Sequence, residues 1–574
     1  MNTKTLTKEK RLDYFKALYK GARAAYSDSL ELFDKYMRQY KGSTEIDGSP
    51  ERASTTRNIT YEIVESQVSS EIPVPKVDTV SYSEKRERCA EVIERLCSSV
   101  KDKLPFEEIN DIDERYTYVF GGSVIFIEWD NSIRLGGEIG AVRVHSISPT
   151  DFIPEPGVFN IDNMEYCFLR FLTTRAEIIR KYGVNASEAM LAQCEAEDED
   201  FTERDTVSVI LAFYKGEGGE IGQFIYSGDL VLRDIEDYYA RKICICKSCG
   251  EEEPNCRCEN PHLYMKNQEY EIILPADQSS KKLTVPYYKP RTFPLVIRKN
   301  TSGGKSLFGQ SDCEYIRPEQ QAINKIETRI LQKLLRSGVT PIVPEDASIA
   351  INNSVFGQVI KMKPGESMAQ YGTVDTTPDI AQDIAEAERL YDHAKRTLGI
   401  SDAFQGIGEF SNESGYARQL RISQASGRLE SKKKMKHAAY SRLYRIIFEH
   451  YLAFADEPRA LTYKDSFGRI HNRSFDRYDF LSYDPVRCCY YYDDAFLFST
   501  DPNGGSQLQR EALWEKNLEN LKAGTLGDPT LPSTLLRYWQ FQERAHYPNA
   551  RENVEYFLEM TKKEGAYDAE AEEY

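Results

Sequence analysis

The chain opens with a helical pattern of apolar positions. Between residues 7 and 40 apolar side chains recur every three or four residues, which predicts one amphipathic helix that ends before Gly42. The same spacing predicts a second helix over residues 83–103. Each of these helices is expected to bury one face against the rest of the protein.

The pattern changes to strands between about residues 115 and 300. Runs of β-branched and aromatic residues predict four strands, which are Tyr116–Asp130, Ala141–Ser148, Thr206–Tyr214 and Gln223–Asp234. Within the first of them, Gly121 and Gly122 predict a turn or a β-bulge. Residues 1–307 are therefore expected to form one mixed region of helices and sheets.

A helix is predicted over residues 308–338. Ser311, followed three positions later by Glu314, fits a capping box at its start. Gly338 follows its last apolar position and predicts its end. Its apolar face consists of Ile323, Ile326, Ile330 and Leu334.

A second helix is predicted over residues 377–399, after a strand-rich excursion at 339–376. Thr377 would be its N-cap, with Pro378 at the first helical position, and Gly399 would end it. Its apolar positions step by four and three residues, which is typical of a packing seam. They are Ile380, Ile384, Ala387, Tyr391, Ala394 and Leu398.

The last third of the chain continues this alternation of helices and loops. A glycine-containing loop at 400–414 leads into a long helix over 415–456. Residues 457–506 are rich in Tyr and Asp and are expected to return as strand or loop, and 507–574 as helices with an acidic tail. The whole is an α+β fold with several domains, because single cores rarely exceed about 300 residues.

Charge narrows the possible functions. The formal net charge of −17 excludes a protein that coats DNA over its whole surface. The predicted long helix is the exception, since Glu430 is the only acid between residues 415 and 446. Its basic residues could meet DNA phosphates or acidic faces of neighbouring subunits, or simply be solvated. The candidates are Arg418, Arg421, Arg428, Lys432, Lys433 and Lys434.

Cysteines gather in one short segment. Five of the 12 lie between Cys244 and Cys258, within a zinc-ribbon-like insertion at 240–262. Four of them, Cys246, Cys249, Cys256 and Cys258, have a spacing that suits tetrahedral Zn2+ in a structural site, with Cys244 as a spare ligand. The alternative is a loop of free thiols. The N-terminus has no apolar signal segment, and no apolar run is long enough to span a membrane.

The order of these elements resembles the portal protein family of tailed bacteriophages. Arg57-Asn58, the entry segment Gly309–Asn324 and the stretch Ser414–Ala417 resemble local motifs of that family. The resemblance covers roughly residues 10–455. It implies a wing (1–307), a first stem helix (308–338), a clip (339–376), a second stem helix (377–399), a tunnel loop (400–414), a long wing-spanning helix (415–456), a wing return segment (457–506) and a helical crown (507–574).

The resemblance also implies a function, which is structural and not enzymatic. Twelve copies would form a ring at one capsid vertex, assembled in the bacterial cytoplasm and carried in the virion, and conduct double-stranded DNA. The implied partners are the terminase large subunit, the major capsid and scaffold proteins, and head-completion or tail adaptor proteins. The loop that lines the channel would contain Gln405, Gly406, Ile407, Gly408, Glu409 and Phe410. The alternative is a nucleic-acid-processing enzyme with a zinc ribbon.

Overall fold

The computed structural model describes residues 8–42, 55–182, 206–239, 242–246, 263–267, 290–336, 339–342, 372–375, 379–400, 427–455, 458–500 and 507–561, apart from short gaps. Its N-terminal part is two helices, α1 (Lys8–Ala25) and α2 (Ser27–Tyr40), so the prediction of one helix is wrong. The break falls at Tyr26 because α1 packs on one core, through Phe15, and α2 packs on another, through Phe33.

Five antiparallel strands form the larger sheet, in the order β4-β5-β6-β7-β8. They are β4 (Phe152–Pro154), β5 (Tyr166–Thr174), β6 (Thr206–Lys215), β7 (Ile221–Ser227) and β8 (Leu230–Ile235), with α6 (Arg175–Tyr182) after β5. Residues 207–214 of β6 are all buried, because both faces of the sheet are covered. The strand predicted over 223–234 is instead the hairpin of β7 and β8.

A smaller antiparallel sheet has the order β11-β2-β3, from β11 (Leu295–Lys299), β2 (Gly122–Leu135) and β3 (Glu138–Ile147). Helix α5 (Phe106–Phe120) packs against it, and α4 (Glu84–Lys103) shares its hydrophobic core and confirms the helix predicted over 83–103. The prediction of strand from Tyr116 is wrong, because these residues end α5. Gly121 caps that helix at φ +86°, and a Cβ there would come within 2.4 Å of the Gly309 carbonyl oxygen.

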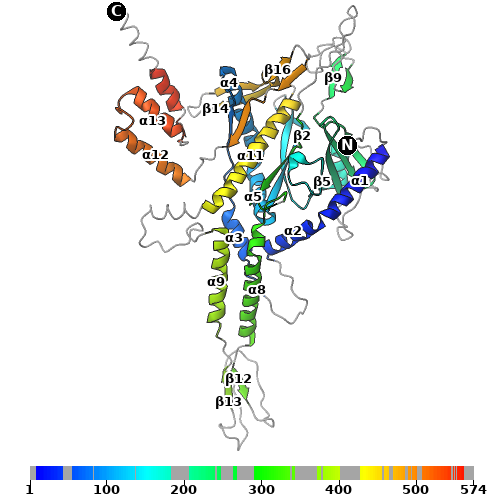
Figure 1. The fold of residues 1–574 in the computed structure, drawn as a ribbon, viewed down its shortest axis with the longest axis vertical. Coiled ribbons are helices and arrows are strands. Elements are labelled where there is room, and N and C mark those ends of the chain that lie inside the picture. The colour runs from blue at the N-terminus through cyan, green and yellow to red at the C-terminus, as the bar shows by residue number, and fades with distance from the viewer. Residues whose placement is uncertain are drawn as a thin grey trace, which may run out of the picture.

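A helix pair, α8 (Asp312–Arg336) and α9 (Ala381–Leu398), projects from the body of the protein (Figure 1). At its tip β12 (Val339–Ile342) pairs with β13 (Gly372–Asp375). Ser311 caps α8 as predicted, since its Oγ accepts from the Cys313 N–H. Helix α9 begins later than predicted, at Ala381, whose N–H donates to Asp379, and it ends at Gly399 as predicted.

The predicted apolar seam of the helix pair is confirmed in part. Ile323, Ile330, Tyr391 and Leu398 are buried, and Ile326 and Ile380 are half-buried. Most of the buried ones join Ile59 and Ile63 of α3 (Ile59–Gln67) in one cluster at the base of the pair. Leu334 and Ile384 are 47% and 46% exposed, so one chain leaves these two positions of the seam uncovered. Two packed helices bury only the faces that they turn toward each other, so side chains on their outer faces stay exposed.

Helix α11 (Gly427–Phe454) crosses the body and is the described part of the predicted long helix (Figure 1). Tyr440, Tyr444 and Phe448 on its inner face are buried in the core beneath the smaller sheet. The chain then returns through β14 (Arg459–Lys464), β15 (Ile470–Phe475), β16 (Leu481–Asp484), β17 (Cys489–Tyr492) and β18 (Phe496–Thr500). Strand β18 pairs with β1 (Pro75–Thr79), so an early and a late segment of the chain meet in this strand pair.

Two further helices, α12 (Gln507–Lys522) and α13 (Pro532–Arg544), follow and pack on each other. Residues 552–561 are also helical. The helical C-terminal region expected from the sequence is therefore present. Among the described helices none is long and apolar enough to cross a bilayer.

Candidate functional site: a buried charge network at the base of the helix pair

Most of the predicted site residues lie outside the described part of the chain. This applies to Cys249, Cys256 and Cys258, to the loop Gln405–Phe410, and to Arg418 and Arg421. Arg428 lies in α11, but its side chain is not described. Their roles stay predictions. Within the described residues, no group of three or more His, Cys, Asp or Glu side chains could hold a metal ion.

The ends of the cysteine segment lie together. Cys246 is the last residue of β9 (Lys242–Cys246), and Leu263 is the first residue of β10 (Leu263–Asn267). These two residues face each other in an antiparallel pair. Residues 247–262, which carry the other three predicted ligands, therefore start and finish at neighbouring positions. Neighbouring ends suit the predicted zinc site, because its four ligands must lie close together.

Fresh protein is expected to contain about one zinc ion per chain, measured by atomic emission. Cys244→Ser combined with Cys249→Ser is expected to lose it, because the spare ligand is then absent as well and three thiolates bind zinc far more weakly than four. Cys89→Ser on α4 is the matched control, since Cys89 is a free thiol in another part of the protein. Equal zinc content in the two variants, or none in the wild type, would exclude the site.

Helix α11 divides its basic residues between two faces. Lys433 and Lys434 are exposed, and Lys434 pairs with Glu430 at 2.9 Å. Lys432 points the other way and is buried. Its Nζ lies 2.6 and 2.8 Å from the carboxylate oxygens of Asp312 and donates to Gln67 Oε1 at 2.9 Å. This corrects the expectation that Lys432 contacts DNA or a neighbouring subunit, because its charge is used inside its own chain.

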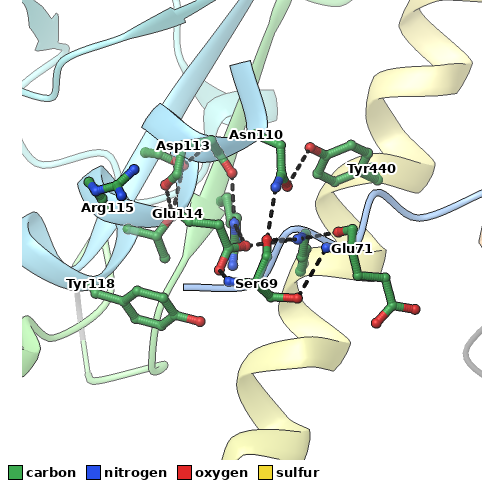
Figure 2. Close-up of polar contacts among 12 residues, drawn as sticks. Ser69, Glu71, Asn110, Asp113, Glu114, Arg115, Tyr118 and Tyr440 are labelled. Atoms are coloured by element: carbon green, nitrogen blue, oxygen red, sulfur yellow. Dashed lines mark hydrogen bonds and ion pairs between the residues drawn. The ribbon is translucent and has the colours of Figure 1, made fainter. Parts of the chain in front are cut away.

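Lys432 belongs to a larger group of buried charges, here called the basal network. Arg298 of β11 is its centre, because Nη1 lies 2.7 Å from Asp113 Oδ2 and 2.7 Å from Glu114 Oε1. Lys436 reaches the same Glu114 oxygen at 2.9 Å. Figure 2 shows Asp113 and Glu114 of α5 on the side that faces α11 and the segment around Ser69. The network consists of Asp113, Glu114, Arg298, Asp312, Lys432 and Lys436.

Neutral polar groups complete the network. Tyr440 on α11 donates to Asn110 Oδ1 at 3.1 Å, and Asn110 donates to the Ser69 carbonyl oxygen at 2.9 Å (Figure 2). Asp312, the first residue of α8, also accepts from Asn300 at 2.8 Å. A carboxylate at that position is stabilised by the helix dipole as well. The network therefore joins the start of α8 to α5, α11 and β11.

The charges of the network balance. Three carboxylates face three cations, and the side chains of Asp113, Glu114 and Asp312 are fully buried. Burial raises the pKa of Glu114, but Arg298 and Lys436 outweigh it and the pKa lies below its ordinary value. Burial also lowers the pKa of Lys436, against the pull of Glu114. Because every charge in the network is paired, the arrangement is suited to holding the helices in one position and is not suited to acid–base chemistry.

Sequence reasoning missed most of this network. Asp113 and Glu114 look like ordinary polar positions of an amphipathic stretch. The one available signal was Arg298, a charged residue that directly follows the apolar run Leu295–Ile297 within β11. Buried charges need partners, so such a residue indicates an ion pair without saying where its partner lies.

Comparison with known proteins leaves the family open. No protein-family model and no curated protein matches this chain. The family resemblance therefore rests on the order of elements and on the local residues given above, and the activity that it implies is a proposal.

Proposed function

We propose that this chain is a portal protein subunit, which forms a ring that conducts double-stranded DNA into and out of a phage capsid. The observation that carries the proposal is the projecting helix pair with two short strands at its tip (Figure 1). The long helix α11 then packs across the body. This is the sequence of parts that the resemblance implies.

The parts take the following roles in this proposal. Helices α8 and α9 form the stem, and the clip at 339–376 docks the terminase large subunit and later the tail adaptors. The tunnel loop at 400–414 lines the channel. The body forms the wing, which meets the capsid and scaffold proteins, and the C-terminal helices form the crown. Net negative charge suits a conduit, because DNA must slide without being held.

The basal network has a mechanical role here. It lies where the stem leaves the wing, and its charges join the first residue of α8 to α11. A buried, fully paired ion network fixes one geometry, because any shift leaves a charge without its partner. We propose that it keeps the angle between stem and wing constant while DNA passes.

Ring closure would use faces that one chain leaves uncovered. Leu334 and Ile384 on the helix pair are both nearly half exposed. In a ring with heterologous contacts, each would be covered by the neighbouring subunit. Apolar side chains at that position would contribute to assembly about 1 kcal/mol or more each.

Electron microscopy of the purified protein, with mass from light scattering, tests the proposal. We expect rings of about a dozen subunits with a hole wide enough for duplex DNA. Leu334→Asp with Ile384→Asp should prevent ring formation, because the charges would be buried between subunits. Leu172→Asp is the control, since Leu172 lies on β5 in the body and is 60% exposed.

A compact two-fold dimer would overturn this proposal. Metal-dependent nuclease or ATPase activity in the same preparation would favour the alternative, the zinc-ribbon enzyme. Rings that form equally well in both variants would leave the portal assignment standing and exclude Leu334 and Ile384 as contacts between subunits.

A further inference from the structure

A groove of about 450 Å³ lies between α2 and α8, at the base of the helix pair. Of the ten described residues that line it, none is acidic and four are cations. These are Lys35 and Arg38 from α2 and Arg317 and Lys325 from α8. The chain has a net charge of −17, but this groove is locally positive.

Helix geometry brings these cations to one place. Lys35 and Arg38 are three residues apart on α2, so they share a face. Arg317 and Lys325 are eight residues apart, with Gln321 and Asn324 at the matching positions between them, so they form one stripe along α8. The two stripes face each other across the groove.

Three of the four cations are available to a ligand. Among the described residues, Lys35, Arg317 and Lys325 make no ion pair. Arg38 pairs with Asp34 at 2.8 Å, but both side chains are more than half exposed. An exposed pair of this kind is worth well under about 1 kcal/mol, so a stronger anion can replace Asp34.

The walls of the groove are fixed before any ligand arrives. Gln39 on α2 donates to the Cys313 carbonyl oxygen of α8 at 3.1 Å. Gln320, which is buried, accepts from the Thr60 N–H at 3.0 Å and donates to the Arg57 carbonyl oxygen at 2.7 Å. A preformed site binds more tightly because little ordering remains to be done on binding.

We propose that this groove binds phosphate groups. Four cations can neutralise neighbouring phosphates, and the amides of Gln321 and Asn324 can donate to phosphate oxygens. An acidic protein segment fits less well, because the lining contains no large apolar residue to hold an anchoring side chain. The source of the phosphate is the DNA backbone if the proposed function holds, or a free phosphate anion otherwise.

The test compares two doubly neutralised proteins. In Arg317→Gln with Lys325→Gln, the groove loses two charges. Lys85→Gln with Lys103→Gln removes two exposed charges at the ends of α4, away from the groove. Binding of a short fluorescent DNA duplex is measured by anisotropy at several salt concentrations. The groove variant should bind about tenfold or more weakly, with a salt slope smaller by about 2, whereas the control keeps the wild-type slope.

Calorimetric titration with tripolyphosphate separates the two sources. A groove variant that loses tripolyphosphate binding but keeps the wild-type salt slope for duplex assigns the groove to free phosphates. Loss of both assigns it to the DNA backbone. If the groove variant and the control behave alike with both ligands, the groove is not a phosphate site. Ring formation is followed on the same samples, so a failure of the portal assignment is seen separately.

Discussion

Replacing Arg298 with methionine is expected to lower the free energy of unfolding by about 3–5 kcal/mol. The substitution keeps most of the side-chain volume but leaves Asp113 without its ion-pair partner and Glu114 paired with Lys436. Both carboxylates are fully buried, so water cannot replace the guanidinium. In a protein of this size the thermal midpoint should fall by about 3–4 °C, measured by scanning calorimetry.

Two further variants show where this cost arises. Arg442→Met is the matched control, because Arg442 pairs with Asp162 at a site where both side chains are partly exposed. It should cost less than about 1 kcal/mol. Adding Asp113→Asn to Arg298→Met should recover part of the loss, because it removes the uncompensated charge. Equal midpoints for the two methionine variants would show that the basal network does not stabilise the fold.

Acid is expected to destabilise the protein through His450, which is fully buried on α11. Its Nδ1–H donates to the Ile446 carbonyl oxygen at 2.8 Å, and its Nε2 has no partner. Burial lowers the pKa of His450 from 6.5 to about 4. Between these values the unfolded chain binds a proton and the folded chain does not. Stability is therefore fully present above about pH 6.5 and is lost as the pH falls toward 4.

The expected loss from His450 is about 3 kcal/mol across that range. His450→Phe should remove it, because Tyr239 and Phe454 already surround the ring with aromatic groups. Burial raises the pKa of the neighbouring Glu449, so acid acts on stability in the opposite sense at that residue. The contribution of Glu449 is the same in the wild type and in the His450 variant. Thermal midpoints of wild type and variant between pH 7 and 4 give the difference. His393→Phe, at an exposed position, is the control. Parallel curves for all three proteins would contradict this assignment.

Local signals in the sequence predicted the helices well where they agreed with packing. The helix at 83–103 and the end of α9 at Gly399 follow from apolar spacing and a glycine cap, both of which depend on nearby residues. The start of α9 was placed too early because Thr377 and Pro378 look like a cap. The described helix instead begins after Ile380, and the Asp379 side chain accepts from the Ala381 N–H. Several acceptors in succession make such a boundary ambiguous.

The errors came from contacts between distant segments. Apolar spacing continues through Tyr26, but the two halves of that stretch pack on different cores, so the helix breaks there. Residues 116–120 have strand-forming side chains, yet they form the end of α5, which packs against α8 at the base of the helix pair. In both cases tertiary packing overrode local preference.

The candidate site was predicted least well, for the same reason. Lys432 and Lys433 are adjacent and chemically identical in the sequence. Only the fold distinguishes the first, which is buried against Asp312, from the second, which is exposed. Arg298 and Asp113 lie 185 residues apart, and no local pattern links them.

The basal network also constrains the order in which the parts of the protein can fold during its synthesis. Asp312 emerges from the ribosome 120 residues before Lys432, its partner. Until α11 has been translated, the Asp312 carboxylate lacks its cation Lys432. Among the described residues, it then has Asn300 and Gln67 as hydrogen-bond donors. Helix α8 is therefore expected to dock late, after translation of α11. Nascent chains that end before residue 427 should remain sensitive to protease at this junction.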